Sequence, residues 1–552
     1  MQITVSELIV KFLERLEIKC IFGMPGAHIL PVYDSLYDSS IQTILAKHEQ
    51  GASFMAGGYA RASGKIGACI TTAGPGATNL VTGIANAYAD KQPILIITGE
   101  TSTHIFGKGG LQESSGEGGS IDQVELFKGI TQYNRIIERT DYLENVLNKA
   151  AKILLSDTPG PVLLSFPFNV QLEKVDDSIL DNIKTTSFDF CMDKSSRDLN
   201  DIYQLLADAK KPVILAGYGC IKSAAQDALN QLSQTLNIPI TSSLKGKGAI
   251  SEGTHLSLGS VGVTSYGKAR EYIIEQADLL IFLGASFNER TSYVWNKDLL
   301  NGKKIIQVDN DFEQLEKVFS AEVAIQGDIK NIVESLNQKI AEQPMPAKQF
   351  NGIENAQENR DDESSGIFHH KFSLIESVFK KMSDAMGMPI QVFDDNIIFA
   401  QNFYQVSVDD RYYPNSGVSS LGHAIPAAIG ARFVDNRPVF AIIGDGGFQM
   451  CCMEIMTAVN YNIPLNIIMF NNSTMGLIRK NQFQQYDERF INCDFINPNY
   501  EYLAKSFGIQ YQRVETEDDL DKAFNESDFE SSINLIEVMI DKNAFPNYVS
   551  KR

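Results

Sequence analysis

The chain has 552 residues, of which 43% are hydrophobic and 21% are charged, a composition typical of a globular protein with roughly three to four domains. Its formal net charge of −20 argues against nucleic acid and anionic membranes as partners. No stretch approaches the ~20 apolar residues needed to span a bilayer, so we expect no membrane association.

The start of the chain, MQITVSELIVKFLERLEIKC, lacks the basic region and the small-residue cleavage site of a secretion signal. The seven cysteines show no C-x-x-C spacing. Cys451 and Cys452 are adjacent in an apolar segment, where buried thiols are expected rather than a disulfide. These features predict a cytoplasmic protein.

Two stretches without hydrophobic periodicity are predicted to be linkers, at 187–200 and at 341–366. They divide the chain into segments 1–186, 200–340 and 367–552. Within each segment, β-branched apolar runs alternate with helical patterns. We therefore expect an α/β protein with three doubly wound parallel-sheet domains.

In the first segment, FGMPGAHIL places His28 in the first β-α loop, where it either faces a bound molecule or has no special role. The next pattern, QTILAKHEQGA, predicts a strand that runs into Glu49. A carboxylate at that place is either a functional group or a solvated acid at the end of a strand.

The first and third segments resemble each other. With a constant offset of 371 positions, Ala60-Arg61 falls on Ala431-Arg432, and a strand, glycine turn, helix, proline and second strand follow in both without a gap. Chance matching of small residues is the alternative, but a pseudo-duplication explains the shared frame better. Gly74 stands where the second copy has Asp445.

In the second copy, AIIGDGGF predicts a buried strand that ends at Asp445, followed by a helix at 450–461 and a second strand, LNIIMF, that ends at Asn471-Asn472. A right-handed crossover brings the carboxyl ends of two such parallel strands to one sheet edge. Asp445 and Asn472 offer oxygen ligands that suit Mg²⁺. A turn acid and a helix-capping asparagine are the alternative.

Three glycines surround this acid, at positions 444, 446 and 447. They let the backbone approach a phosphate group, and the following helix N-terminus favours its negative charge. The pattern therefore predicts a magnesium-bound diphosphate.

Taken together, GDGGF…NN resembles the diphosphate and metal motif of thiamine diphosphate enzymes, and the similarity to the superfamily of acetolactate synthase, pyruvate oxidase and benzoylformate decarboxylase runs nearly end to end, from FGMPGAHILPVYDSL to FINPNYEYLAKSFGI. The resemblance implies a pyrimidine-binding domain (1–186), a central nucleotide-binding-type domain (200–340), a linker (341–366) and a diphosphate- and Mg²⁺-binding domain (367–552). It also implies that Mg²⁺ binds Asp445, Asn472 and the Thr474 carbonyl.

The same resemblance also identifies residues that would activate the cofactor and hold it in its bent conformation. Glu49 matches the family's glutamate, which activates the cofactor through the pyrimidine N1′, and Leu421 in SSLGHAIP matches the apolar residue beneath the bent cofactor. The implied cofactor contacts are Gly26, Gly74, Asn79, Leu421, Gly444, Gly446, Gly447 and Met475.

Two further residues are candidates for proton transfer and acceptor positioning. His28 lies in a GAHI pattern similar to that of benzaldehyde lyase-like members, in which this histidine relays protons. Gln112 matches the family's pocket glutamine by its local LQ context, whereas the spacing from Ile121-Asp122 points to Gly118 or Gly119. The extra residues of this loop either shape a larger acceptor pocket or lie disordered.

Two departures from the family pattern stand out. Biosynthetic acetolactate synthases typically have a lysine where this chain has Phe168, which weakens that specific assignment. In the central segment, SFNER keeps Arg290 but has Ser286 in place of the first arginine of an FAD-binding RFDDR-like stretch. Bound FAD and vestigial loss of an FAD site both remain open.

The sequence thus predicts a thiamine diphosphate- and Mg²⁺-dependent carboligase that decarboxylates a 2-keto acid, pyruvate first, and transfers the acyl unit to a keto acid, a ketone or a keto sugar. The alternatives are a 2-keto acid decarboxylase, an acyloin or diketone lyase, and a catalytically silent nucleotide-binding subunit. The resemblance implies a homodimer or homotetramer with active sites between subunits.

Overall fold

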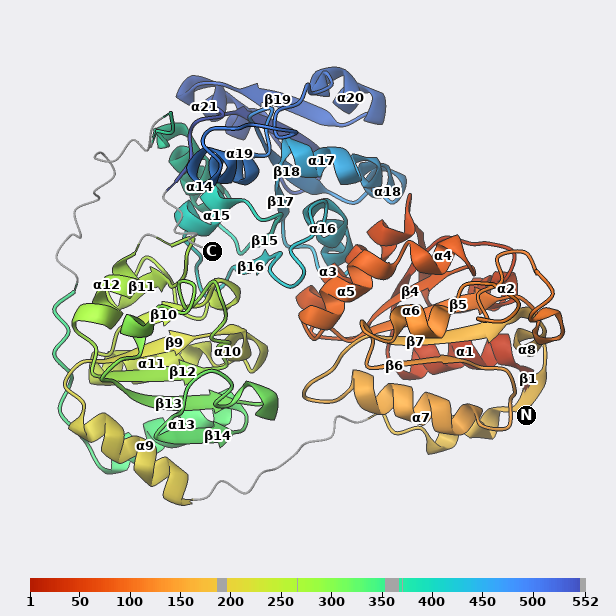
Figure 1. Cartoon of the computed structure of the whole chain (residues 1–552), viewed down its shortest axis with the longest axis horizontal. Coiled ribbons are helices and arrows are strands. Elements are labelled where there is room, and N and C mark those ends of the chain that lie inside the picture. Colours follow the sequence, from red (N-terminus) through yellow and green to blue (C-terminus); the bar gives the residue numbers. More distant parts are fainter. Residues whose placement is uncertain (186–195, 266, 353–366, 370, 547–552) are drawn as a thin grey trace.

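The computed structural model describes residues 1–185, 196–265, 267–352, 367–369 and 371–546. Three six-stranded parallel sheets with flanking helices form three lobes, coloured red to orange, yellow to green, and teal to blue along the chain (Figure 1). The predicted fold class is confirmed. No helix in the described part of the chain is long and apolar enough to cross a membrane.

The first sheet has the strand order β3-β2-β4-β5-β7-β6. Its central strands are buried at every position, because helices cover both faces of a parallel sheet. Its strands are β2 (Cys20–Gly23), β3 (Gln42–Leu45), β4 (Gly67–Thr71), β5 (Ile94–Glu100), β6 (Tyr133–Ile136) and β7 (Val162–Pro167), and its helices are α1 (Val5–Arg15), α2 (Leu30–Tyr37), α3 (Glu49–Ser63), α4 (Pro75–Thr78), α5 (Val81–Ala89), α6 (Gln123–Phe127), α7 (Leu143–Leu154) and α8 (Phe168–Gln171). A short antiparallel pair, β1 (Gln2–Thr4) with β8 (Lys174–Asp176), was not predicted.

The third sheet repeats this order with β16-β15-β17-β18-β20-β19. Its strands are β15 (Gln391–Asp394), β16 (Arg411–Pro414), β17 (Val439–Gly444), β18 (Leu465–Asn471), β19 (Gln510–Val514) and β20 (Ile533–Met539), and its helices are α14 (Ser373–Ala385), α15 (Ile398–Phe403), α16 (Ala424–Arg432), α17 (Asp445–Cys451), α18 (Ile455–Asn460), α19 (Gly476–Gln485), α20 (Tyr500–Phe507) and α21 (Glu517–Glu526). Strand β18 lies at the predicted offset of 371 positions from β5. The shared topology confirms the pseudo-duplication.

The central sheet has a different order, β11-β10-β9-β12-β13-β14, which is that of dinucleotide-binding domains. Its strands are β9 (Pro212–Ala216), β10 (Ile240–Ser242), β11 (Ser257–Ser260), β12 (Leu279–Leu283), β13 (Lys304–Asp309) and β14 (Val323–Gln326), and its helices are α9 (Ser196–Asp208), α10 (Tyr218–Lys222), α11 (Gln226–Leu236), α12 (Lys268–Glu275) and α13 (Ile329–Glu342).

The two predicted linkers are partly helical where the structure describes them. Helix α9 begins at Ser196, inside the predicted linker 187–200, because Ile202 and Leu206 of this helix pack into the central core. Helix α13 reaches Glu342, inside the predicted linker 341–366. Residues 187–195 and 353–366 of these predictions lie outside the described residues.

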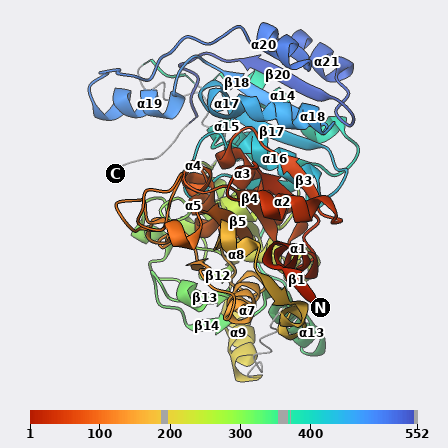
Figure 2. The same cartoon turned by 90° about the vertical axis from the view of Figure 1, so that its right-hand side faces the viewer.

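The two outer domains pack against each other through α3 and α16, which lie side by side in both views (Figures 1 and 2). A Cβ added to Gly58 would lie 2.0 Å from the carbonyl oxygen of Ala427, and one added to Gly430 would lie 2.0 Å from that of Met55. Only glycine permits so close a contact at these two positions. One hydrophobic cluster continues from the first sheet into the third.

Candidate active site

Glu49 is the first residue of α3 and follows the carboxyl end of β3. His48 caps the helix, because its Nδ1 accepts the N–H of Gln50 at 3.1 Å. Glu49 Oε2 accepts a hydrogen bond from Nδ2 of Asn79 at 2.9 Å. The structure therefore brings together two predicted residues, Glu49 and Asn79, from separate elements.

His28 and Gln112 also meet, although 84 positions separate them. His28 Nδ1 lies 3.3 Å from Gln112 Oε1, and the hydroxyl of Thr72 donates to the same oxygen at 3.5 Å. The imidazole is buried, and this burial lowers the pKa of His28 below its ordinary value, an effect that the hydrogen bond to Gln112 opposes. A neutral histidine is therefore favoured at neutral pH.

The two glycines predicted in these loops lie beside this pair. A Cβ at Gly26 would be 2.5 Å from Cβ of Thr72. Gly74 has a φ of 59°, and a Cβ there would be 3.0 Å from Cβ of Gln112. Larger residues at either position would displace Thr72 or Gln112, so both glycines keep the His28–Gln112 pair in place.

The long loop between β5 and α6 follows a defined path. Glu113 accepts hydrogen bonds from the backbone of Gly107 at 2.6 Å and Gly110 at 2.9 Å, and from the Ser115 hydroxyl at 2.7 Å. The sequence left open whether Gln112 or a glycine at 118 or 119 corresponds to the family's pocket glutamine. In the structure Gln112 lies beside His28, whereas Gly118 packs against Gly107. This internal scaffold favours a pocket wall over disorder for the extra residues.

Sequence reasoning missed Glu100, the last residue of β5. Its Oε1 accepts the N–H groups of Thr101 at 2.7 Å and Ser114 at 3.1 Å, while its buried Oε2 has no hydrogen-bond partner among the described residues. Ser114 in turn accepts the Gly74 N–H and donates to the Gln112 carbonyl, both at 3.1 Å. Glu100 thus supports the Gln112 loop. One sequence signal could have identified Glu100: at the offset of 371 it corresponds to Asn471, the residue before the candidate ligand Asn472.

We expect Glu100→Gln to change the pH dependence of stability. Burial raises the pKa of Glu100 to about 7 from an ordinary value of 4.5, so its contribution to stability is present below pH 4.5 and is lost as the pH rises through 7. Glutamine keeps the Oε1 acceptor and stays neutral. The variant's thermal midpoint, relative to wild type, should rise by roughly 2–4 °C between pH 5 and pH 8. If the two thermal midpoints differed by the same amount at pH 5 and at pH 8, Glu100 would not have a raised pKa in the folded protein.

The carboxylate of Asp445 is buried where β17 ends. Oδ1 accepts the Gly446 N–H at 3.0 Å, and Oδ2 accepts the Ser473 N–H and Nδ2 of Asn497, both at 2.7 Å. Burial raises the pKa of Asp445 despite these bonds. The contact with Ser473 brings the carboxylate next to Asn472, as the crossover argument predicts. Asn497, in FINPNYEYLAKSFGI, was not predicted as a site residue.

The 472–474 turn carries the other two predicted oxygen ligands, the side chain of Asn472 and the Thr474 carbonyl. Thr474 pairs with Asp494 in an isolated antiparallel bridge, whose hydrogen bonds are made by the neighbouring residues Met475 and Ser473. In such a pair the residue between the bonds directs its own N–H and C=O away from the partner strand. The Thr474 N–H bonds to Asn472 Oδ1 at 3.2 Å, and its carbonyl makes no ladder hydrogen bond.

This donor set fits a hard cation that also binds a diphosphate. Hydrogen bonds occupy three of the roughly four acceptor positions of the Asp445 carboxylate, which leaves about one for a metal ion. The other two candidate ligands, Asn472 Oδ1 and the Thr474 carbonyl, are uncharged oxygens. In the described part of the chain, no three His, Cys, Asp or Glu side chains form a metal cluster. A cation here would therefore depend on phosphate oxygens for most of its compensating charge.

The helix after Asp445 differs from the prediction. Helix α17 begins at Asp445 itself, a 3₁₀ turn (Cys452–Glu454) interrupts it, and α18 ends at Asn460, whereas the sequence predicted a helix at 450–461. Gly446 and Gly447 lie in its first turn because larger residues there would meet Met475 Sδ at 2.8 Å and an Asp395 oxygen at 2.4 Å. At Gly444 an added Cβ would make an ordinary van der Waals contact, 3.6 Å from Cδ1 of Ile397.

Leu421 lies, half-buried, in the turn before α16. The turn is fixed by Asp395, which accepts the backbone N–H groups of Gly422 and His423 at 2.8 Å and of Ala424 at 3.2 Å. A carboxylate therefore caps the N-terminus of α16 and sets the position of Leu421. Asp395 was not predicted from the sequence.

No hydrogen bond or ion pair described in the chain joins the Glu49 and His28–Gln112 groups directly to the Asp445 group. The Glu49 group lies at the carboxyl end of the first sheet, and the Asp445 group lies at the carboxyl ends of β17 and β18 in the third sheet. The chain therefore presents two half-sites, one on each outer domain.

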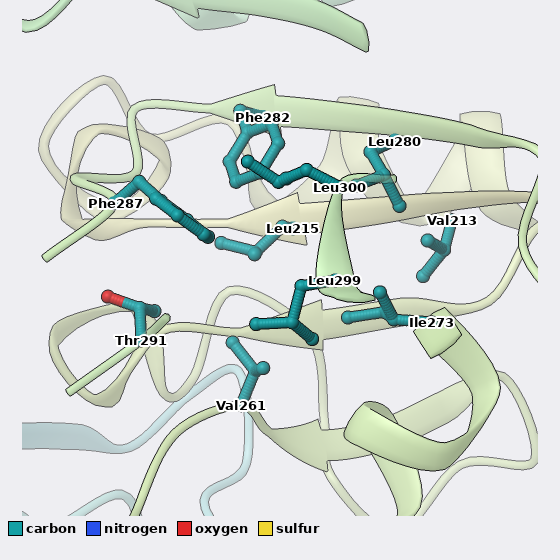
Figure 3. A pocket seen from close by; sticks show the side chains of 10 residues that line it. All are labelled: Val213, Leu215, Val261, Ile273, Leu280, Phe282, Phe287, Thr291, Leu299 and Leu300. Carbon is teal, nitrogen blue, oxygen red and sulfur yellow. The ribbon is translucent and has the colours of Figure 1, made fainter. Parts of the chain in front are cut away.

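The central domain contains a small apolar cavity within its core (Figure 3). Thr291 is the one hydroxyl-bearing residue among its lining side chains, which are Val213, Leu215, Val261, Ile273, Leu280, Phe282, Phe287, Thr291, Leu299 and Leu300. A lining of this kind suits a gap in packing and does not fit the phosphates of FAD.

The sheet edge where a dinucleotide would bind is closely packed. A Cβ at Gly217, after β9, would lie 1.9 Å from the carbonyl oxygen of Gly284, after β12. Ion pairs from the first domain reach the same edge, Lys91 with Asp311 and Asp90 with Lys245. No contact at this edge assigns an FAD site, so FAD remains an open question for this domain.

Comparison with known families covers most of the chain. Residues 3–126 match the thiamine pyrophosphate enzyme N-terminal TPP binding domain, residues 199–336 match the central domain, and residues 396–538 match the C-terminal TPP binding domain. The outer two matches contain Glu49 and Asp445, respectively.

Curated relatives agree over nearly the full length. A probable acetolactate synthase large subunit from Methanococcus aeolicus is 33% identical over 95% of this chain and 89% of the relative. The acetolactate synthase isozyme 2 large subunit of Escherichia coli is 31% identical over 98% of this chain and 96% of its own. The large subunit from Lactococcus lactis is 31% identical over 98% and 92%. The chain therefore belongs to the thiamine pyrophosphate enzyme family, as a thiamine diphosphate-dependent enzyme that forms carbon–carbon bonds.

Proposed function

We propose that this enzyme decarboxylates pyruvate, with Mg²⁺ as the second cofactor, and transfers the remaining two-carbon unit to a second carbonyl compound. The observation that carries the proposal is the presence of both half-sites in one chain: the Glu49–Asn79 pair on the first sheet and the Asp445 turn on the third. The names of the relatives, acetolactate synthase large subunits, support pyruvate as the donor.

Thiamine diphosphate supplies a carbanion that adds to the substrate carbonyl and then stores the electrons released with CO₂. Glu49 would hold the proton at the pyrimidine N1′, with Asn79 orienting its carboxylate. Leu421 would support the bend of the cofactor. Asp445, Asn472 and the Thr474 carbonyl would hold Mg²⁺. Gly26, Gly74, Gly444, Gly446, Gly447 and Met475 would line the rest of the cofactor site.

His28 and Gln112 would act on the second carbonyl compound. Because Gln112 Oε1 can only accept, the neutral His28 is assigned the tautomer with the proton on Nδ1. Nε2 then keeps its lone pair and can take or return a proton at the acceptor oxygen. The pair is thus suited to transfer a proton during ligation.

We expect Gln112→Leu to separate ligation from decarboxylation. Losing this half-buried hydrogen bond should lower the yield of ligated product about 10-fold, while CO₂ release falls much less. The measurement is the ratio of ligated product to CO₂ released from pyruvate. Gln132→Leu, at a glutamine that bonds the Thr158 carbonyl away from the site, is the control. An unchanged ratio would remove Gln112 from acceptor positioning.

The two half-sites further support a site shared between subunits. No described hydrogen bond or ion pair joins Glu49 to the Asp445 turn within the chain, and we infer that a second copy would bring its Asp445 half to the Glu49 half of the first. The active form would be a homodimer or homotetramer. Sedimentation of the holoenzyme together with activity against protein concentration tests this point.

The direct test is product analysis after incubation with thiamine diphosphate, Mg²⁺ and pyruvate alone. Acetolactate would make pyruvate both donor and acceptor despite Phe168. Acetaldehyde with CO₂ would mean that the acceptor is another ketone, keto acid or keto sugar. Absence of CO₂ would overturn the proposal in favour of acyloin or diketone cleavage, which the GAHI loop favours. The visible spectrum of the same preparation reveals whether FAD is bound.

A further inference from the structure

One continuous segment of the third domain, residues 445–461, holds the strand and turn that lead to Glu49. Near its end, the Tyr461 hydroxyl accepts the Leu45 N–H at 2.8 Å and donates to the Thr43 carbonyl at 3.2 Å. One helical turn earlier, the Thr457 hydroxyl lies 3.4 Å from the Leu45 carbonyl. These contacts fix β3 against the third domain.

Glu454 completes this series at the turn itself. Its side chain is 3% exposed. Oε1 accepts the backbone N–H groups of Lys47 at 3.0 Å and His48 at 2.9 Å, and Oε2 accepts the Thr457 hydroxyl at 2.9 Å. These are the two amides immediately before Glu49. A Cβ at Gly51 would lie 2.2 Å from Oε1, so the carboxylate packs directly against the backbone of the first turn of α3.

We propose that Glu454 is a positioning residue for Glu49. The inference rests on the proposed role of Glu49 at the cofactor. Burying a carboxylate is costly unless hydrogen bonds compensate, and two of the three donors that Glu454 recruits belong to the peptide units next to Glu49. With both amides fixed, movement of the Glu49 Cα is restricted.

The position of Glu454 gives this contact a second consequence. Asp445 begins α17, and Glu454 ends the 3₁₀ turn that follows, so nine positions of short helix connect the candidate metal ligand to the support of Glu49. The same segment therefore carries a residue of one half-site and supports the other.

The test compares Glu454→Ala, Glu454→Gln and Tyr461→Phe in the full-length holoenzyme. The first readout is exchange of the thiazolium C2 proton of bound thiamine diphosphate for deuterium, followed by NMR after acid quench. The second is thiamine diphosphate affinity in Mg²⁺ by calorimetry. Glu454→Ala should slow exchange on the order of 100-fold, the effect expected of a 1 Å misplacement, with affinity little changed.

The two other variants separate positioning from general stability. Glutamine can keep Oε1 as acceptor for both amides, so Glu454→Gln should restore most of the exchange rate. Tyr461→Phe loses contacts to β3 and should lower thermal stability while leaving exchange unchanged. If Glu454→Ala does not fold, Glu454→Asp, which is one methylene shorter, should give the slow exchange in its place.

Three results would overturn the inference. Wild-type exchange in a folded Glu454→Ala or Glu454→Asp protein, alongside slow exchange in Glu49→Gln, would remove Glu454 from positioning but leave the proposed function intact. Equally slow exchange in all the Glu454 variants and in Tyr461→Phe would indicate a structural role alone. Wild-type exchange in Glu49→Gln itself would overturn the role of Glu49, and this inference with it.

Discussion

Glu49→Gln should lower kcat for CO₂ release from pyruvate by at least about 100-fold, the size expected when a group that moves a proton is removed. Glutamine has nearly the same shape, and its Oε1 can still accept the hydrogen bond of Asn79 Nδ2, so the start of α3 should not move. Only the ability to hold a proton at the pyrimidine is lost. Thiamine diphosphate affinity should therefore change much less than kcat.

Glu125→Gln is the matched control, because Glu125 is an exposed glutamate of the same domain that pairs with Lys128. It should keep wild-type kcat. If Glu49→Gln also kept most of its activity, Glu49 would have no part in cofactor activation. Full complementation in the host by an inactive Glu49→Gln protein would instead favour the catalytically silent subunit.

Asp445→Asn is the second change for which we expect a large effect. Removing one charged partner of a buried pair costs about 2–5 kcal/mol, so the apparent Kd for thiamine diphosphate in Mg²⁺ should rise by about two orders of magnitude. The amide also places an NH₂ group where one carboxylate oxygen stood, facing either the Gly446 N–H or the two donors on Oδ2, which adds to the loss. Calorimetric titration with and without Mg²⁺ measures both effects.

Asp494→Asn is the control, since this half-exposed acid lies beside the same turn but pairs with Arg479. It should bind the cofactor normally. Removal of Mg²⁺ by EDTA should weaken cofactor binding in wild type and have little further effect in Asp445→Asn. Equal EDTA sensitivity of the two proteins would place the metal elsewhere.

The sequence allowed the local features of the fold to be predicted. The strand that ends just before Asp445 follows from an apolar run that stops at a charged residue, and the crossover rule places Asp445 beside Asn472. The strand predicted to run into Glu49 ends four positions earlier, at Leu45. The repeated frame, with its offset of 371, predicts the matching sheets. These signals are short in range or periodic, so they can be read without knowing the tertiary structure.

What could not be predicted depends on contacts between distant parts of the chain. Glu100, Asp395 and Glu454 acquire their roles only in the folded chain, where the backbone brings N–H groups to their carboxylates. The start of α17 was missed because the glycines after Asp445 indicate a loop when considered alone. The pairing of β1 with β8 joins residues at least 170 positions apart, for which no periodic signal exists.

The contact between α3 and α16 bears on the origin of the chain. The two helices occupy equivalent places in the repeated frame, since each ends near the shared Ala-Arg pair. Two close approaches join these helices, Gly58 to Ala427 and Gly430 to Met55. If the offset of 371 is used to exchange the two copies, the first approach falls on the second to within one position. A surface that meets its own counterpart in this way is the mark of an isologous twofold dimer.

The two outer domains are thus related as the protomers of an isologous dimer are, an arrangement that fusion of two copies of one domain would produce. Fusion frees each former protomer from having to supply every function, since its twin is always present in equal number. The difference between Asp445 and Gly74, at equivalent positions of the two copies, is an example of such specialisation.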